Sequence, residues 1–125
     1  MVVIAGASLT IVTLIALALI AKPPLLLAVI LLNLVTFVAS YGVVIVSQGR
    51  ALFPLNLAGR GATTVNMAQL LGLMGLPILT GLIIGQFPPV GGFVPEIAYR
   101  AAFTALAIGN LCGLLIYLRS PDSRP

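Results

Sequence analysis

Polar side chains recur along one face of an otherwise apolar segment, residues 24–48. Asn33, Thr36 and Ser40 follow at spacings of three and four, which places them on one side of a helix. Phe37 and Tyr41 lie beside that face, one turn apart. Amide and hydroxyl groups can donate and accept hydrogen bonds. The pattern predicts either the lining of a cavity that holds a small solute or hydrogen bonds to a neighbouring helix.

This sequence contains few residues that could act in catalysis or bind a metal ion. It contains no histidine, a single cysteine, Cys112, and two acids, Glu96 and Asp122. Zinc and haem sites draw their ligands mainly from histidine and cysteine, and nucleophilic catalysis needs a base beside the nucleophile. We therefore expect no enzyme activity, no metal site and no cofactor.

Four long apolar stretches make up most of the chain. Hydrophobic residues are 61% of the 125 and charged residues 6%, whereas a soluble domain carries about 25% charged residues. A helix of about 20 residues crosses a hydrocarbon core of roughly 30 Å, and continuously apolar runs favour helix over strand. The sequence predicts an all-α fold, a polytopic transmembrane helix bundle in the lipid bilayer. We expect one domain over 1–125, with four membrane-spanning helices at about 2–21, 24–48, 62–87 and 97–118 and a polar tail at 119–125.

The third apolar stretch is rich in glycine and has a proline near its middle. Small residues let helix backbones approach closely in a membrane, and a proline inside a helix removes one backbone hydrogen bond. The pattern predicts a helix that packs closely on a neighbour or kinks, at Gly72, Gly75, Pro77, Gly81 and Gly85.

Basic residues are scattered over the loops and helix ends. They are Lys22, Arg50, Arg60, Arg100, Arg119 and Arg124. No basic stripe is present, so we expect no nucleic-acid partner. With four crossings, the linker at 49–61 and the tail lie on the same side of the membrane. That side then holds four of the basic residues, and the opposite side holds two. This excess favours both termini in the cytoplasm, with Arg50, Arg60 and Arg119 as topology anchors.

Several segments are similar to the final helices of a known transporter family. Residues 47–60, with Phe53-Pro54 and a Gly-Arg pair near each end, lead into 61–66 and resemble the linker into the eleventh helix of major facilitator superfamily transporters. Residues 96–103 are similar to the start of the twelfth helix, and 118–122 to its cytoplasmic exit. The resemblance covers nearly the whole chain and implies that its helices correspond to the last four of twelve.

This resemblance implies a function in membrane transport. In the family the tenth helix lines the substrate cavity, which favours cavity lining for Asn33, Thr36, Ser40 and Tyr41. It implies a secondary transporter, or permease, for an unknown small-molecule substrate in a bacterial inner membrane. Alternating access needs two halves, so we expect a fragment that is inactive alone and whose partners are the missing N-terminal helices of a parent or split transporter.

Two other functions fit a stand-alone four-helix membrane protein. One is an exporter of the small multidrug resistance kind, although that class relies on an acid in its first helix and residues 2–21 contain none. The other is a non-transporting subunit of a membrane assembly.

Overall fold

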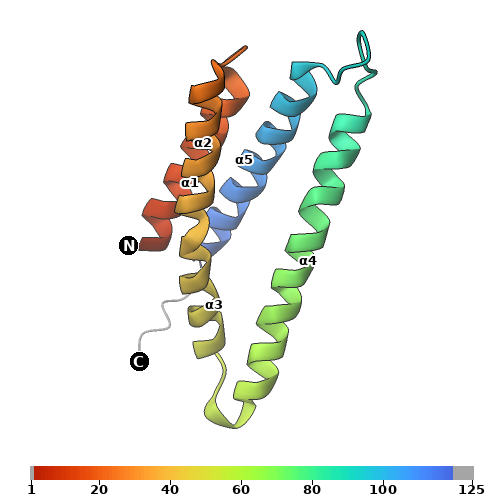
Figure 1. The fold of residues 1–125 in the computed structure, drawn as a ribbon. Helices are drawn as coiled ribbons and strands as arrows, with labels where there is room; N and C mark the ends of the chain where they lie inside the picture. Colours follow the sequence, from red (N-terminus) through yellow and green to blue (C-terminus); the bar gives the residue numbers. More distant parts are fainter. Residues whose placement is uncertain (1, 120–125) are drawn as a thin grey trace.

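Helices account for nearly all of the chain that this computed structural model describes, residues 2–119 (Figure 1). The helices are α1 (Val2–Leu19), α2 (Leu25–Val38), α3 (Gly42–Ala51), α4 (Ala58–Gly85) and α5 (Glu96–Arg119), with short 3-10 helices η1 (Ala39–Tyr41) and η2 (Leu55–Leu57). They form four spans, because α2, η1 and α3 run on as one. Each span is long and apolar enough to cross a membrane, which confirms the predicted transmembrane helices and indicates an integral membrane protein.

The second span is interrupted where the sequence predicts a continuous helix. One turn, η1, separates α2 from α3. Ser40 and Gly42 lie at this break, and a nearby serine and glycine are a common cause of helix irregularity. The Ser40 hydroxyl donates to the Phe37 carbonyl at 2.7 Å, three residues back, so its hydrogen bond stays within the span.

The third span begins earlier and ends two residues sooner than predicted, and the fourth extends one residue at each end. Helix α4 begins at Ala58 rather than near residue 62, and it includes glycines and an arginine that the sequence suggests for a linker. Gly61 is buried beneath the Phe53 ring, where a Cβ would lie 2.5 Å from two ring carbons. Arg119 ends α5 instead of opening the tail. Residues 120–125, predicted as tail, lie outside the described residues.

Helix α1 is the most enclosed helix of the bundle. Its buried residues form a broad stripe in which neighbours lie three or four positions apart: Val3, Ala7, Thr10, Ile11, Thr13, Leu14, Leu17 and Ala18. It packs most extensively on α5 and also contacts α2 and α3. The two buried threonines donate to carbonyls of their own helix, Thr10 to Gly6 at 2.9 Å and Thr13 to Leu9 at 2.8 Å. Their burial therefore leaves no donor unpaired.

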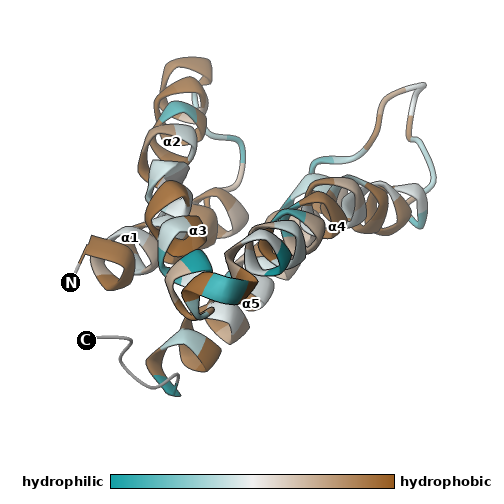
Figure 2. Ribbon diagram, turned by 90° about the horizontal axis from the view of Figure 1, so that it is seen from below, coloured by the Kyte–Doolittle hydropathy of each residue, from teal (hydrophilic) through white to brown (hydrophobic). Residues whose placement is uncertain are grey.

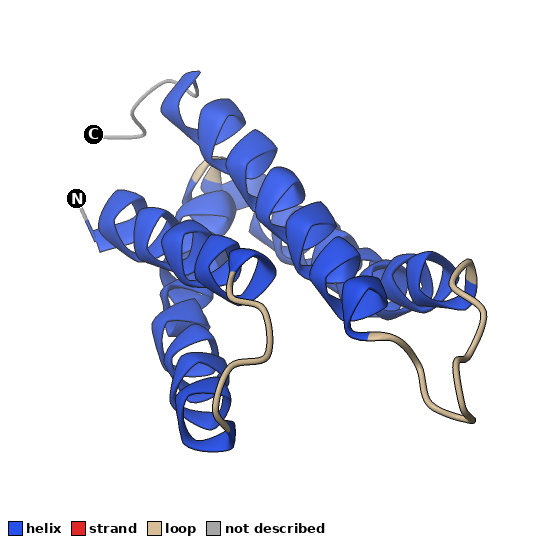
Figure 3. Ribbon diagram, turned by 90° about the horizontal axis from the view of Figure 1, so that it is seen from above, coloured by secondary structure: helices blue, strands red, loops and turns tan. Residues whose placement is uncertain are grey.

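Helix α4 stands apart from the first two helices. In the described part of the chain it contacts α3 and α5 but neither α1 nor α2. Figures 1 and 3 show the resulting splay, with α4 leaning away from α2. Most residues of α2 and α4 are exposed or half-exposed, and their surfaces are largely apolar (Figure 2). These faces are therefore open to lipid chains or to other helices.

The four predicted packing glycines of α4 have no close neighbour among the described residues. A Cβ added at Gly72, Gly75, Gly81 or Gly85 would meet nothing within 4 Å. Pro77 lies inside the single helix α4 and leaves the carbonyl of the residue four before it without its usual partner. The packing role of this face and the kink at Pro77 stay predictions.

A close approach occurs at another glycine, Gly6 of α1. The Tyr41 ring lies so near that a Cβ at this position would be 2.6 Å from its Cδ1 atom. Only a residue without a side chain lets η1 pack this tightly on α1.

The chain order of the helices divides the charges between the two ends of the bundle. Arg50 ends α3, Arg60 begins α4 and Arg119 ends α5, so all three lie at the end where α1 begins. Lys22 and Arg100 lie at the opposite end. Figure 2, seen from below, shows hydrophilic residues where α3 meets α4.

Candidate functional site

The predicted polar residues of the second span are exposed in this structure. Asn33 donates to the Val29 carbonyl at 2.8 Å, and Thr36 donates to the Leu32 carbonyl at 3.1 Å. Like Ser40, each bonds to its own helix and, among residues 2–119, to no neighbouring helix. The alternative role in interhelical hydrogen bonding is therefore not seen within the described chain.

Asn33 is the residue of this set with the most unused hydrogen-bonding capacity. Its amide has two N–H groups and a carbonyl oxygen, of which the Val29 bond uses one N–H. The residue lies about 12 Å along the helix from Leu25, well inside a membrane-length span. An unpaired amide is costly in hydrocarbon, and polar groups at this depth usually face protein or a water-filled cavity.

The two aromatic candidates lie in different surroundings. The Phe37 side chain is 78% exposed. Tyr41 is half-buried against α1 and lines a second site, a pocket of about 440 Å³ between α1, α3 and α5. Asn110 and Tyr117 line the same pocket, and the Tyr117 hydroxyl donates to Gln48 Oε1 at 2.9 Å. The structure thus brings Tyr41 to a different site from Asn33.

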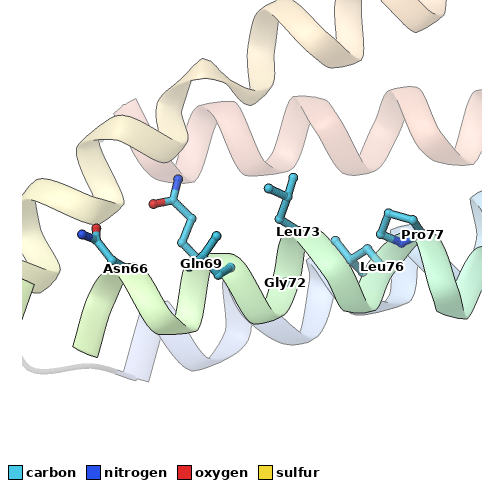
Figure 4. Close-up of a pocket in the computed structure, with 7 residues that line it drawn as sticks. Asn66, Gln69, Gly72, Leu73, Leu76 and Pro77 are labelled. Atoms are coloured by element: carbon cyan, nitrogen blue, oxygen red, sulfur yellow. The ribbon is translucent and has the colours of Figure 1, made fainter. Parts of the chain in front are cut away.

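A longer groove runs along α4 (Figure 4). It encloses about 780 Å³ and is lined by Asn66, Gln69, Leu70, Gly72, Leu73, Leu76 and Pro77. The labelled Asn66 and Gln69 lie at one end of the groove, and Pro77 lies at the other (Figure 4). The groove is polar at the end near α3 and apolar along the rest of its length.

A cleft between α3 and α4 adjoins the polar end of this groove. It encloses about 270 Å³ and is lined by Val43, Val46, Ser47, Arg50 and Gln69. Gln69 lines both the cleft and the groove. Arg50 Nη2 donates to Asn66 Oδ1 at 3.1 Å, which joins the end of α3 to α4.

Asn66, Gln69 and Asn110 are residues that the sequence prediction of a site leaves out. Asn66 and Gln69 are three apart in an apolar helix, the same kind of signal that singles out Asn33 and Thr36. Asn110 is an isolated polar residue, and its place in a pocket depends on the packing of α5 against α1 and α3.

No chemically reactive cluster is found in the described part of the chain. Between residues 2 and 119, no group of three or more His, Cys, Asp or Glu could hold a metal ion. Cys112 is a free, exposed thiol on α5.

Comparison with protein-family models, curated proteins and solved structures finds no match to this chain. The candidate site is therefore described by its geometry in this structure alone.

Proposed function

We propose that the four spans form part of a secondary transporter of the major facilitator type, which moves a small solute across a bacterial inner membrane. The observation that carries this proposal is the polar face of the second span. Asn33, Thr36 and Ser40 are exposed in a membrane-length span, and their side chains make no hydrogen bond to another described helix. Such a face is unfavourable against lipid and suits a water-filled pathway.

In this proposal, further helices complete the cavity opposite α2. Helix α2 packs on α1, and its half-buried residues lie opposite the polar face, which therefore points away from the described bundle. These half-buried residues are Leu27, Ala28, Leu31, Leu34, Val35 and Val38. The resemblance relates α2 and α3 to the cavity-lining tenth helix of the family. Alternating access needs two halves that move about a shared site, so the described helices alone do not transport.

The proposed orientation places both termini in the cytoplasm. Arg50, Arg60 and Arg119 lie at one end of the bundle, against Lys22 and Arg100 at the other. An excess of basic residues at one end marks the cytoplasmic side of a membrane protein.

A solute-uptake screen tests this function. Membrane vesicles from cells with and without the complete transporter are compared for saturable uptake of labelled small polar solutes. We expect at least one solute whose uptake needs the protein. Since the Asn33 amide would offer a solute two hydrogen bonds, Asn33→Leu should lower uptake efficiency about tenfold.

Two threonines provide a matched control pair. Thr36 and Thr13 each donate to a carbonyl four residues back, but Thr13 is buried in α1. We expect Thr36→Val to reduce uptake and Thr13→Val to leave it unchanged. Equal uptake with and without the protein for every solute would argue for a non-transporting membrane subunit instead.

A further inference from the structure

We propose that the cleft between α3 and α4 binds a phosphate group through Arg50, Asn66 and Gln69. This site lies apart from the exposed face of Asn33. The proposal does not depend on transport, because the binding chemistry is set by the α3–α4 contact alone.

The cleft brings a guanidinium and two amides together from two helices. Arg50 and Ser47 come from α3, and Gln69 from α4. The bond of 3.1 Å from Arg50 Nη2 to Asn66 Oδ1 draws the guanidinium toward α4. The small volume of about 270 Å³ suits a compact group held at the mouth of the cleft rather than a large solute.

Hydrogen-bond donors predominate in this cleft. A guanidinium has five N–H donors, and the Asn66 bond uses one of them. Because Asn66 accepts through its oxygen, its amide N–H groups remain available, and the Gln69 amide has no partner among the described residues. The Ser47 proton is already donated to the Val44 carbonyl at 2.8 Å. A ligand rich in acceptor oxygens fits this arrangement.

The charge at this site favours an anion. Glu96 is the only acid among residues 2–119, and it lies at the opposite end of the bundle, so the guanidinium has no carboxylate partner within that range. The planar fork of arginine matches the geometry of phosphate oxygens and binds them with two parallel bonds.

The level of the cleft in the membrane also suits a phosphate group. Helix α4 has 28 residues and is about 42 Å long, which exceeds a hydrocarbon core of about 30 Å. Its charged and amide residues, from Arg60 to Gln69, lie in its first half, whereas Thr80 is the single polar side chain of its second half. The excess length therefore projects at the α3 end and places Arg50 near the headgroups.

Phosphate at this level has two sources, a phospholipid headgroup and a free phosphate or phosphorylated solute. Both offer the same acceptor oxygens. They are separated by two titrations of the full chain in maltoside micelles free of phospholipid. One uses inorganic phosphate, and the other uses short-chain phosphatidylglycerol.

The readout is the NMR signal of the Arg50 side-chain Nε–H group, assigned with Arg50→Gln. Arg60 is the internal control, since it lies at the same end of the bundle but does not line the cleft. We expect a saturable shift at Arg50 and none at Arg60. A response to both probes indicates a free-phosphate site, and a response to phosphatidylglycerol alone indicates a lipid site. The proposal is overturned if neither probe gives saturation, or if both arginines respond alike.

Amide substitutions test the donor set without changing charge. Gln69→Leu should weaken binding of the effective probe about tenfold to a hundredfold, the loss expected for one hydrogen bond to a charged group. Gln86→Leu, at the far end of α4, removes an amide away from the cleft and should leave the affinity unchanged. Equal affinities in Gln69→Leu and the unmodified chain would also overturn the assignment.

Discussion

The guanidinium of Arg100 on α5 donates a hydrogen bond from Nε to the backbone carbonyl of Ala18, in the last turn of α1. Its Nη2 atom lies 3.4 Å from the next carbonyl oxygen, that of Leu19. The last carbonyls of a helix lack partners within the helix and carry a partial negative charge. The Arg100 side chain, from a helix far along the sequence, therefore caps the end of α1 and links α1 to α5.

We predict that Arg100→Leu lowers the free energy of unfolding by about 1.5–3 kcal/mol, the usual range for a hydrogen bond to a charged group. The measurement is equilibrium unfolding of the purified chain in mixed micelles. Arg119→Leu is the control, because it removes the same charge at the other end of α5, where no hydrogen bond of the Arg119 side chain is seen among residues 2–119. Equal losses in both variants would contradict a capping role.

The turn between α1 and α2 leads to a second prediction. Lys22 has a φ of 51°, a left-handed conformation that side chains disfavour. Its backbone N–H donates to Glu96 Oε1 at 2.7 Å, so α5 also holds this turn. Since glycine adopts this conformation without a Cβ clash, Lys22→Gly should raise stability by about 1 kcal/mol.

The control for this turn is Lys22→Ala, which keeps the Cβ and loses the same charge. Its stability should stay close to that of the unmodified chain in the same unfolding assay. A gain in Lys22→Ala equal to that in Lys22→Gly would mean that charge, rather than backbone conformation, determines the effect.

Packing of Tyr41 on Gly6 provides a third prediction. A Cβ at Gly6 would lie 2.6 Å from Tyr41 Cδ1, so Gly6→Val should destabilise the chain by about 1–3 kcal/mol. Adding Tyr41→Ala should recover part of this loss, because the smaller side chain removes the clash. Gly75→Ala, with open space around its Cβ, should cost little. Additive effects of Gly6→Val and Tyr41→Ala would contradict the contact.

The four spans could be predicted because the signal for them is local and long. Long apolar runs are separated by the Pro23-Pro24 pair, the linker at 49–61 and the Pro88-Pro89 pair. These runs predict the ends of the helices to within about four residues. The η1 break could not be predicted in the same way, since serine, threonine and glycine also occur within unbroken helices such as α1. Its position depends on how Tyr41 packs on α1.

Contacts between segments far apart in the sequence are harder to predict than the spans themselves. Close approach occurs at Gly6 and Gly61, each beneath an aromatic ring, and at Gly49 of α3, beside Val65 of α4. It does not occur at the regularly spaced glycines of α4. The Arg100 contact reaches backbone carbonyls, and a carbonyl has no signature in a sequence. Asn66 and Gln69 carried a usable signal, but their partner Arg50 follows only from the packing of α3 on α4.

Thiol accessibility in native membranes tests the proposed pathway most directly. Single cysteines replace Asn33, Thr36 or Ser40 in the complete protein, on a Cys112→Ala background because Cys112 is exposed. Ile108→Cys is the control, since Ile108 is 58% exposed and lies near the middle of α5. A membrane-impermeant maleimide reacts with thiolates, which form in water and are suppressed in apolar surroundings.

If α2 lines a water-filled pathway, cysteines at the three polar positions should be modified at least about tenfold faster than the cysteine at position 108. A permeant maleimide applied after unfolding in detergent confirms that all four thiols can react. Labelling at positions 33, 36 and 40 that is as slow as at position 108 would contradict the pathway, and with it the proposed transport function.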